Sequence, residues 1–458
     1  MNFAGQKVAV VGLGRSNLAL IRWLRERGAR VTALDRARPE ELGDRYRELL
    51  ALGVEDLVLG PSYLDRLAEF PVVFLTPGMP KHLPPIAAAR AAGAWVTGEI
   101  PLVLRLARAP VVGITGSAGK TTTTTLVGEI LKASGREVYV GGNIGRPLIE
   151  VVETIPPTAV IVLELSSFQL ELADRSPPVA VITNVTPNHL DVHPSMEAYV
   201  DAKRNIYRFQ GPEGRVVLSA DNPVTAALAA EVGERAILFS RRGDPGGRAA
   251  AYVDGDQVLW RLGGDRIGVV RLDELRIPGA HNVENVLAAV AAAFLAGGTW
   301  HGMRQVLPHF AGVEHRLEPV REVDGVRYVN DSKATAPAET MAALAALPGP
   351  IVLIAGGYDK RIAFDDLARA IVEGPVHTLV LMGATAGAIE AAVEAERGGR
   401  ATPRVLRAKD MEEAVRLARQ AARPGDTVLL SPACASYDLY ANFEERGRHF
   451  KALVHQLA

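Results

Sequence analysis

The chain has 458 residues, 48% of them hydrophobic and 22% charged, which excludes a disordered or fibrous protein. The length predicts about three domains of roughly 150 residues each. Its 51 basic and 52 acidic residues nearly cancel, so we expect no general binder of nucleic acid or anionic membranes. The one cysteine, Cys434, excludes a disulfide within the chain and favours a reducing compartment.

Lysine is scarce in this chain, because nine of the basic residues are lysine and the rest are arginine. A lysine is therefore a candidate for work that arginine cannot do, such as accepting CO2 on a free amine. The N-terminus enters a strand-like stretch without a secretory signal, and the longest apolar stretch, Val286–Ala296, is shorter than the ~18 residues of a membrane span. These features predict a cytoplasmic protein without a membrane partner.

Short runs rich in valine and isoleucine alternate with longer stretches rich in alanine, leucine and arginine. The short runs are Lys7–Val11, Val111–Thr115, Ala159–Leu163, Val179–Thr183, Ile351–Ala355, Thr378–Met382 and Thr427–Leu430. This alternation predicts an α/β protein with mostly parallel sheets buried on both faces. Ligands are then expected just beyond the carboxyl ends of the strands.

Two breaks in this pattern predict domain boundaries. A helical stretch ends in proline at Arg105–Pro110, and an apolar helix ends near Phe310–Arg316. The predicted domains are residues 1–109, 110–315 and 316–458. Within the second, the glycine- and charge-rich segment from about Arg241 to Gly268 predicts loops with short strands.

A glycine turn follows the first strand, at Gly12-Leu-Gly14-Arg-Ser-Asn17, and Asp35 ends the next strand. A strand, a glycine turn and a helix N-terminus suit a diphosphate. The pattern is similar to a dinucleotide fingerprint, but Asn17 stands where the third glycine belongs. A tight turn without a ligand is the alternative interpretation.

The sharpest motif is a phosphate loop, Gly116-Ser-Ala-Gly119-Lys120-Thr121, between an apolar strand and an amphipathic helix. Its glycines let backbone N–H groups face phosphates, Lys120 can reach the terminal phosphates, and the Thr121 hydroxyl can bind Mg2+. Ile114 replaces the first glycine of the strict pattern, so the motif is a shorter variant.

Three further residues of the central domain have side chains suited to such a site. Glu164 ends a buried strand, where a carboxylate can hold Mg2+. His189 and His193 have the spacing of a zinc pair, but the glutamate of that motif is missing, which favours a single histidine, His189, near the nucleotide. Lys203 lies in a predicted helix, and its spacing alone indicates only a solvated lysine.

Three strand-end motifs of the last domain carry lysines and hydroxyl groups. They are Asn330-Asp-Ser-Lys-Ala-Thr335, Gly356-Gly-Tyr-Asp-Lys360 and Ser431-Pro-Ala-Cys-Ala-Ser436-Tyr-Asp. These residue types suit an anionic substrate, without indicating which anion. Cys434 has no catalytic partner in its own motif and is predicted to be a small buried residue.

In this order, the motifs resemble the Mur ligases, the ATP-dependent amide-forming enzymes of bacterial peptidoglycan synthesis. The resemblance runs from Val8 to about Phe450 and rests on G-x-x-G-K-T-T, L-E-x-S-S-F-Q-L, N-x-x-x-x-H-L-D, H-N-x-x-N and N-D-S-K-A-T. The ending at Ser431 together with Asn442-Phe-Glu-Glu-Arg-Gly447 is its most specific part, and is similar to the branch of the family that uses D-glutamate.

The resemblance implies a Rossmann-like N-terminal domain that binds a UDP substrate, a central P-loop ATPase-like domain and a Rossmann-like C-terminal domain that binds the amino acid. It also implies a reaction in peptidoglycan precursor synthesis. ATP phosphorylates the carboxylate of UDP-N-acetylmuramoyl-L-alanine to an acyl phosphate, and the D-glutamate amine displaces the phosphate. Such chemistry depends on positioning and charge neutralisation. A monomer is expected.

The resemblance further implies roles for single residues. The expected catalytic residues are Lys120, His189, Lys203 and Lys333. The expected nucleotide contacts are Gly116, Gly119, Lys120, Thr121, Thr122, Asn282, Asn285, Arg316 and Asp331. Two Mg2+ sites are expected at Thr121, Glu164, His189 and a carbamylated Lys203. The UDP substrate is expected at Ser16, Arg36, Gly78, Asn143 and His189, and D-glutamate at Thr335, Lys360, Ser436 and Phe443.

Several residues differ from the usual pattern of the family. Ser117 and Ala118 replace threonine and asparagine in the phosphate loop, Asn188 replaces an aspartate, and Ala336 replaces an asparagine. Other functions stay open at this point: another Mur ligase or a folylpolyglutamate synthase, an NAD-dependent oxidoreductase based on Gly12–Asn17 and Asp35, and a non-catalytic ATP-dependent switch.

Overall fold

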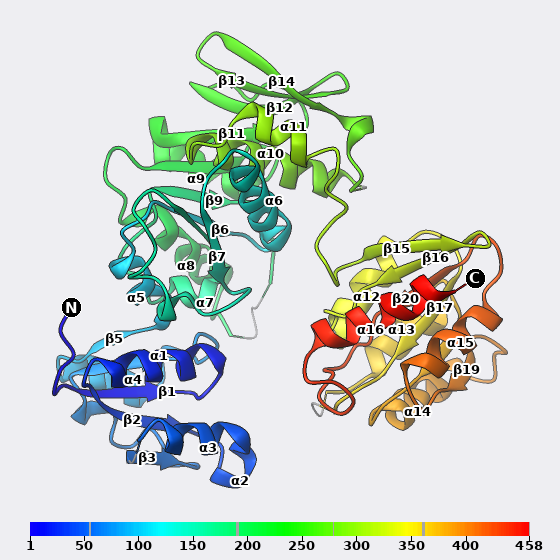
Figure 1. The fold of residues 1–458 in the computed structure, drawn as a ribbon, viewed down its shortest axis with the longest axis horizontal. Coiled ribbons are helices and arrows are strands. Elements are labelled where there is room, and N and C mark those ends of the chain that lie inside the picture. Colours follow the sequence, from blue (N-terminus) through cyan, green and yellow to red (C-terminus); the bar gives the residue numbers. More distant parts are fainter. Residues whose placement is uncertain (55, 189–191, 278, 360–361, 458) are drawn as a thin grey trace. The chain divides into compact units, whose positions relative to one another are not determined.

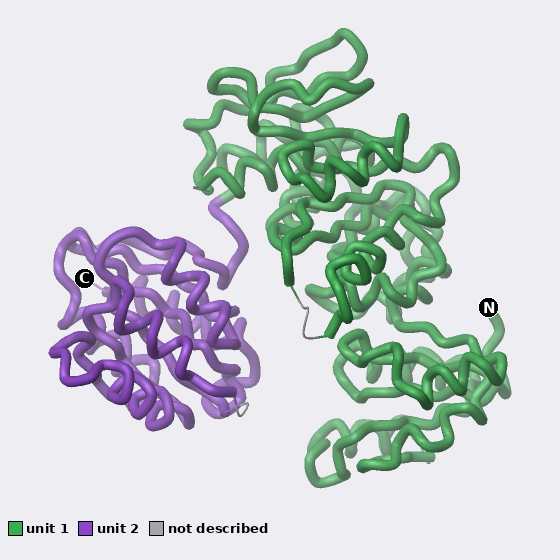
Figure 2. Tube along the Cα trace, turned by 180° about the vertical axis from the view of Figure 1, so that it is seen from behind, with its two compact units in different colours: residues 1–310 green, residues 311–458 purple. Residues whose placement is uncertain are grey.

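The computed structural model describes residues 1–458 except 55, 189–191, 278, 360–361 and 458. Its secondary structure is mixed α/β, and the predicted fold class is confirmed (Figure 1). The chain divides into two compact units, which we call unit 1 (Met1–Phe310) and unit 2 (Ala311–Ala458) (Figure 2).

Unit 1 begins with a five-stranded parallel sheet of order β3-β2-β1-β4-β5. Its strands are β1 (Lys7–Val11), β2 (Arg30–Asp35), β3 (Asp56–Leu59), β4 (Val72–Leu75) and β5 (Trp95–Thr97). Its helices are α1 (Arg15–Glu26), α2 (Pro39–Leu42), α3 (Asp44–Ala51), α4 (Pro84–Ala91) and α5 (Glu99–Leu106). The central strand β1 is apolar on both faces, as the valine-rich run Lys7–Val11 requires.

The second sheet of unit 1 has nine strands in the order β14-β13-β12-β11-β10-β9-β6-β8-β7. Its parallel strands are β6 (Val111–Thr115), β7 (Val138–Gly142), β8 (Val160–Glu164), β9 (Val179–Ile182), β10 (Arg215–Ser219), β11 (Ala236–Ser240) and β12 (Ala249–Asp254). The antiparallel edge adds β13 (Gln257–Leu262) and β14 (Asp265–Arg271). The segment from about Arg241 to Gly268, predicted to form loops with short strands, contributes such strands to the edge of the sheet, where Val258 and Trp260 are buried.

Helices cover both faces of this second sheet. The helices of unit 1 after α5 are α6 (Lys120–Ala133), α7 (Ser167–Leu170), α8 (Met196–Arg208), α9 (Pro223–Val232), α10 (Ala280–Leu295) and α11 (Trp300–Val306). Side chains of α6 and α10 share one apolar cluster with Val112 and Val162, and side chains of α8 and α9 share another with Ile161 and Leu163. Because neighbouring strand residues point to opposite faces, both sides of the sheet are buried.

The two sheets of unit 1 share one hydrophobic core. The cluster that contains Val8 and Trp23 of the first sheet's layer continues into Ile149 and Val152. The Trp23 indole N–H donates to Glu153 at 3.2 Å. Residues 1–109 and the part that follows therefore pack together within unit 1.

Unit 2 has a six-stranded sheet of order β15-β16-β20-β17-β18-β19, parallel except for β15. Its strands are β15 (Glu318–Val323), β16 (Val326–Asn330), β17 (Ile351–Ala355), β18 (Val376–Leu381), β19 (Arg404–Arg407) and β20 (Thr427–Leu430). Its helices are α12 (Pro337–Ala346), α13 (Asp365–Glu373), α14 (Ala386–Arg397), α15 (Met411–Ala421) and α16 (Phe443–Gln456). Two apolar clusters, one with α12–α14 and one with α15 and α16, bury its two faces.

Among the described residues, every helix is too short or too polar to cross a lipid bilayer.

Candidate functional site

The phosphate loop joins the end of β6 to the start of α6. Gly116 has φ +153° and Gly119 has φ +81°, conformations that residues with a side chain rarely adopt. The Lys120 ammonium donates to the carbonyls of Gly116 (3.0 Å) and Ser117 (3.3 Å). The predicted strand, glycine loop and helix N-terminus are thus in place for phosphate oxygens, and Thr121 and Thr122 lie buried in the first turn of α6.

The loop after β9 holds the phosphate loop in shape. Thr183 Oγ1 donates to the Ala118 carbonyl at 2.6 Å, and the Ala118 N–H donates to Asn184 Oδ1 at 3.0 Å. The Ser117 hydroxyl donates to the Thr186 carbonyl at 2.9 Å. Ser117 and Ala118, which differ from the family's usual residues, are therefore anchored by this loop. Sequence reasoning missed Thr183, whose signal was its place at the end of β9.

Glu164 lies at the end of β8, which is directly beside β6. It is 2% exposed, and its Oε1 accepts from Asn143 Nδ2 at 2.8 Å. The Oε2 atom is also buried, and it has no hydrogen-bond partner within the described part of the chain. A buried carboxylate oxygen without a partner fits a divalent cation, which takes carboxylate oxygens as ligands.

Lys203 reaches the phosphate loop from α8. Its ammonium donates to the Gly116 carbonyl at 3.1 Å and lies 4.5 Å from the centre of the Tyr199 ring. Lys203 is 1% exposed, and burial, with Lys120 nearby, holds its pKa well below the usual value. No carboxylate pairs with it among the residues the structure describes. The prediction of a solvated helix lysine, which the spacing alone indicated, is therefore wrong.

Asn285 of α10 lies against the phosphate loop. A Cβ added to Gly119 would be 2.0 Å from Asn285 Oδ1, so the two residues approach each other very closely. Asn285 Nδ2 donates to Asn282 Oδ1 at 3.1 Å. Two asparagines expected at the nucleotide thus share one hydrogen bond beside the loop. His189, expected close by, lies outside the described residues.

The glycine turn after β1 has its own internal anchors. Asn17 is buried, and its amide donates to the carbonyls of Val11 (3.0 Å) and Gly12 (2.7 Å). Asp35 accepts backbone N–H groups from Leu13 (2.7 Å) and Ala37 (2.9 Å). In a nicotinamide dinucleotide site, an acid at this position binds a ribose hydroxyl. Here Asp35 instead accepts backbone N–H groups of the turn, and this does not favour the oxidoreductase hypothesis.

The residues expected at the UDP substrate differ in their solvent exposure. Ser16 lines a cavity of about 10 Å³ with Pro77, Glu99, Phe168 and Gln169. Arg36, Gly78 and Asn143 are exposed. Asn143 bonds to Glu164 through both its backbone N–H (2.8 Å) and its side chain.

In unit 2, a cavity of about 240 Å³ brings together three residues expected at the nucleotide and the phosphate, Arg316, Asp331 and Lys333. Asp331 accepts from the Ser431 hydroxyl at 2.7 Å and from the Leu317 N–H at 3.1 Å. Burial raises its pKa to about 6, with these hydrogen bonds opposing the shift. A carboxylate in this setting can accept a ligand hydroxyl.

Three of the residues expected at D-glutamate, Thr335, Ser436 and Phe443, lie on segments near Arg446, a residue of the Asn442–Gly447 motif to which the sequence analysis gave no role of its own. Arg446 is 1% exposed and donates to the Ser332 carbonyl (2.8 Å) and the carbonyls of Cys434 (3.0 Å) and Ala435 (3.1 Å). It thereby ties together the loops that carry Thr335 and Ser436, next to Phe443 at the start of α16. Lys360 lies outside the described residues.

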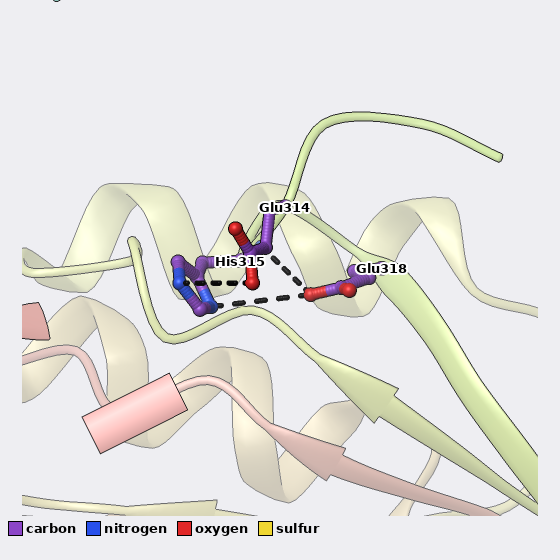
Figure 3. Close-up of side chains that lie close together, drawn as sticks. All are labelled: Glu314, His315 and Glu318. Carbon is purple, nitrogen blue, oxygen red and sulfur yellow. Dashed lines mark hydrogen bonds and ion pairs between the residues drawn. The ribbon is translucent and has the colours of Figure 1, made fainter. Parts of the chain in front are cut away.

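Figure 3 shows Glu314, His315 and Glu318, whose ligand-type atoms lie within 4.8 Å of one another. The Lys451 ammonium pairs with Glu314 at 3.1 Å and also with Glu318, so a side-chain cation already neutralises both carboxylates. His315 Nδ1 lies 2.9 Å from the Asn330 amide. We therefore interpret this cluster as an ion-pair network that holds the start of unit 2 rather than as a metal centre.

Three protein-family models match this chain. They are "Mur ligase MurD-like, N-terminal domain" at residues 6–98, "Mur ligase middle domain" at 114–293 and "Mur ligase, glutamate ligase domain" at 315–434. The order of the matches is that of the motifs in the sequence.

Relatives match over nearly the full length. The UDP-N-acetylmuramoylalanine--D-glutamate ligase of Symbiobacterium thermophilum is 64% identical, over 99% of this chain and 98% of its own. The enzymes of the same name from Pelotomaculum thermopropionicum and Clostridium kluyveri are 46% and 45% identical, each over 99% of this chain, and over 98% and 97% of their own lengths.

Solved structures share the fold at lower identity. The UDP-N-acetylmuramate-alanine ligase MurC of Thermotoga maritima is similar with a TM-score of 0.55 at 19% identity, over 98% of this chain and 99% of its own. A pseudomurein peptide ligase type C from Methanothermus fervidus has a TM-score of 0.53 at 19% identity, over 99% of this chain and 100% of its own.

Proposed function

The chain belongs to the Mur ligase family, and from this premise we propose that it joins D-glutamate to UDP-N-acetylmuramoyl-L-alanine, using ATP, in peptidoglycan precursor synthesis. The observation that carries the proposal is full-length identity of 64% to a relative named for this reaction. The motif around Ser431–Asp438 and Asn442–Gly447, which is similar to that of the D-glutamate branch, agrees with it.

The proposed reaction has two steps. A carboxylate oxygen of the L-alanyl group attacks the γ-phosphorus of ATP, and ADP leaves with the electrons of the broken P–O bond. The D-glutamate amine then attacks the acyl phosphate carbonyl, the C–O bond to phosphate breaks, and the amine loses a proton. Both steps gain most from positioning and from neutralising charge on phosphate oxygens.

Residues of unit 1 would bind the phosphates of ATP. The loop from Gly116 to Gly119 lies at the N-terminus of α6, and the Lys120 ammonium, which donates to the Gly116 carbonyl, can turn to a phosphate oxygen. Thr122 of the first turn and Asn282 and Asn285 of α10 complete the expected nucleotide contacts.

Residues of unit 2 would serve the rest of the nucleotide. We assign Arg316 and Asp331 to the nucleotide, with a ribose hydroxyl as the partner of Asp331, and Lys333 to the transferring phosphate. Their common cavity supports this assignment. Lys is suited to the phosphate because its ammonium is a compact point charge.

Mg2+ would be held at two sites by Thr121, Glu164, His189 and a carbamylated Lys203, and would neutralise phosphate charge when bound. The partnerless Oε2 of Glu164 supports the first site. For the second, the Lys203 amine adds to CO2, forming an N–C bond and releasing a proton. Its burial without a carboxylate partner among the described residues favours the neutral amine that this reaction needs.

The other substrates would meet residues at the strand ends. Ser16, Arg36, Gly78, Asn143 and His189 are assigned to the UDP substrate, and Thr335, Lys360, Ser436 and Phe443 to D-glutamate. Because these substrates and ATP are metabolites of the cytoplasm, we place the enzyme there. We also propose that it acts as a monomer.

The proposal is tested by ADP formation with each substrate left out in turn. We expect turnover only when UDP-N-acetylmuramoyl-L-alanine, D-glutamate and Mg2+ are all present. Activity with L-glutamate or a diamino acid in place of D-glutamate would show that the acceptor is wrong. ADP formation without any acceptor would instead support an ATP-dependent switch.

The carbamate is tested separately with Lys203→Ala, which should remove most activity. A small carboxylate such as formate should restore part of it, because it can supply the two missing oxygens. Lys132→Met, at an exposed lysine of α6, is the control for loss of a lysine. Unchanged activity of Lys203→Ala would exclude the role.

A further inference from the structure

Lys81 is a buried lysine that none of the roles above uses. Lys81 comes directly after the loop Thr76–Pro80, which follows β4 and contains Gly78. Its exposed fraction is 9%. A lysine is rarely this buried unless its charge is paired. In a chain that uses arginine for most of its cations, this position needs an explanation of its own.

The Lys81 ammonium holds its own loop from the inside. It donates to the carbonyl of Pro77 and, at 2.5 Å, to the carbonyl of Met79. These two carbonyls flank Gly78, which is exposed. The three residues Pro77, Gly78 and Met79 are thereby bent around one cation, and such charge-assisted bonds are stronger than neutral ones.

The same ammonium also connects this loop to the following layer of unit 1. It lies 3.8 Å from the carboxylate of Glu171, directly after α7, and Glu171 in turn lies 3.7 Å from His193 Nδ1. His193 is 2% exposed and stacks on the ring of Phe168 at 5.0 Å. Lys81 therefore links the loop after β4 to the segment that follows Glu164.

These contacts border the small cavity introduced above. Pro77 on one side and Phe168 and Gln169 on the other line it together with Ser16. Burial lowers the pKa of Lys81 to about 8, while Glu171 opposes the shift. The carboxylate thus helps to keep the ammonium charged near neutral pH.

We propose that Lys81 is a positioning residue for the UDP substrate: it orders the loop around Gly78 and fixes it against Glu171 and the Phe168 segment. This inference rests on the proposed function, which assigns Gly78 to that substrate. In this role Lys81 acts through the backbone of the loop, by way of the Pro77 and Met79 carbonyls. Its loss is expected to weaken binding of the UDP substrate while the chemical step and the ATP site are left intact.

The test compares steady-state kinetics of Lys81→Met with the unaltered enzyme. Methionine keeps most of the side-chain length but removes the charge and the donors. We expect the KM for UDP-N-acetylmuramoyl-L-alanine to rise about tenfold, the loss typical of one charge-assisted hydrogen bond. The kcat and the KM for ATP should stay within about twofold, since the contacts of Lys81 among the described residues are with Pro77, Met79 and Glu171, which lie outside the phosphate loop. Lys132→Met is the matched control.

A second variant separates positioning from general stability. Glu171→Gln keeps the shape but removes the ion pair, and should raise the same KM about threefold. In the double variant Lys81→Met/Glu171→Gln the KM should equal that of Lys81→Met, because Glu171 acts on the loop through its contact with Lys81. If Lys81→Met does not fold, Glu171→Gln alone decides the matter.

Two results would overturn the proposal. One is an unchanged KM for the UDP substrate in both variants, and the other is a parallel loss in kcat and in all three KM values. Calorimetric titration of the UDP substrate into each variant measures the affinity for that substrate directly, because it does not depend on turnover. If the unaltered enzyme binds that substrate but does not use D-glutamate, the proposed function fails while the role of Lys81 is still measured.

Discussion

At the scale of single residues, Glu99 is a carboxylic acid almost fully removed from water. It stands at the start of α5, is 7% exposed, and its Oε1 has no hydrogen-bond partner within the described part of the chain. Burial raises its pKa to about 7, and the backbone N–H of Ile149 opposes the shift. The folded protein therefore binds this proton more tightly than the unfolded chain does.

Glu99→Gln should change how stability depends on pH. The folded-state pKa lies above the unfolded value, so the acid lowers stability progressively as pH rises from about 4.5 to about 7, by on the order of 3 kcal/mol. The glutamine side chain does not titrate in this range, so its presence removes this pH dependence of stability. The free energy of unfolding in urea, measured for both proteins from pH 5 to pH 8, should fall more steeply for the unaltered protein. Parallel pH profiles would contradict the raised pKa.

Arg446 is the second residue whose burial has a measurable consequence. Its guanidinium holds the Ser332 hydroxyl at 3.0 Å and three backbone carbonyls of two loops. Burial lowers its pKa to about 10, so it stays charged at neutral pH. Removing it would leave several buried acceptors without donors.

We predict that Arg446→Met lowers the free energy of unfolding of unit 2 by about 3 kcal/mol. Urea unfolding followed by far-UV circular dichroism measures the loss, and tryptophan fluorescence of the same samples, which reports unit 1, separates the two units. The control is Arg448→Met, because Arg448 is an exposed arginine of the same helix. Equal effects of the two substitutions would show that the buried hydrogen bonds do not stabilise unit 2.

At the scale of elements, the start of α6 depends on one glycine. Gly119 precedes the helix with φ +81°, and Asn285 Oδ1 occupies the space that a Cβ would need. Gly135 follows the same helix with φ +79°, and nothing lies within 4 Å of the Cβ it lacks. A side chain would strain the backbone at either position, but only at Gly119 would it also be crowded.

Gly119→Ala should raise the KM for ATP by about tenfold or more, because alanine moves Asn285 or the phosphate loop as well as straining the backbone. Gly135→Ala should cost about 1 kcal/mol of stability and leave the KM for ATP unchanged. The measurement is the ATP dependence of turnover for both variants. Equal KM values for ATP in Gly119→Ala and Gly135→Ala would contradict the close approach of Asn285 to Gly119.

At the scale of the whole molecule, two units with separate cores are joined by one chain segment. Among the described residues, three apolar clusters consist of residues of unit 1 and two consist of residues of unit 2. All four tryptophans, Trp23, Trp95, Trp260 and Trp300, belong to unit 1. Tryptophan fluorescence therefore reports unit 1 alone, whereas circular dichroism reports both units.

We expect the two probes to give different unfolding curves in urea. Units with their own cores unfold as separate cooperative structures, so the midpoints need not coincide. Fluorescence and far-UV circular dichroism recorded on the same samples test this. Superimposable curves would show that the chain unfolds as one cooperative structure.

The sequence alone was sufficient for features that depend on neighbours along the chain. The alternation of apolar runs predicted the α/β class, the phosphate loop predicted its strand, turn and helix, and the ordered motifs predicted the family; all of these are confirmed. Local spacing carries this information because backbone conformation and periodicity are set within a few residues.

Only the tertiary structure decided which polar side chains are buried and what they contact. Lys203 looked like a surface lysine and is buried against the phosphate loop. No sequence motif singled out Lys81, which reaches Glu171, 90 positions later in the sequence. Arg446 joins the loop at Ser332, 114 positions earlier, to the loop at Cys434, 12 positions earlier. The glycine-rich stretch near Trp260 pairs into antiparallel strands. These contacts depend on burial between distant segments, which no local pattern of residue types records.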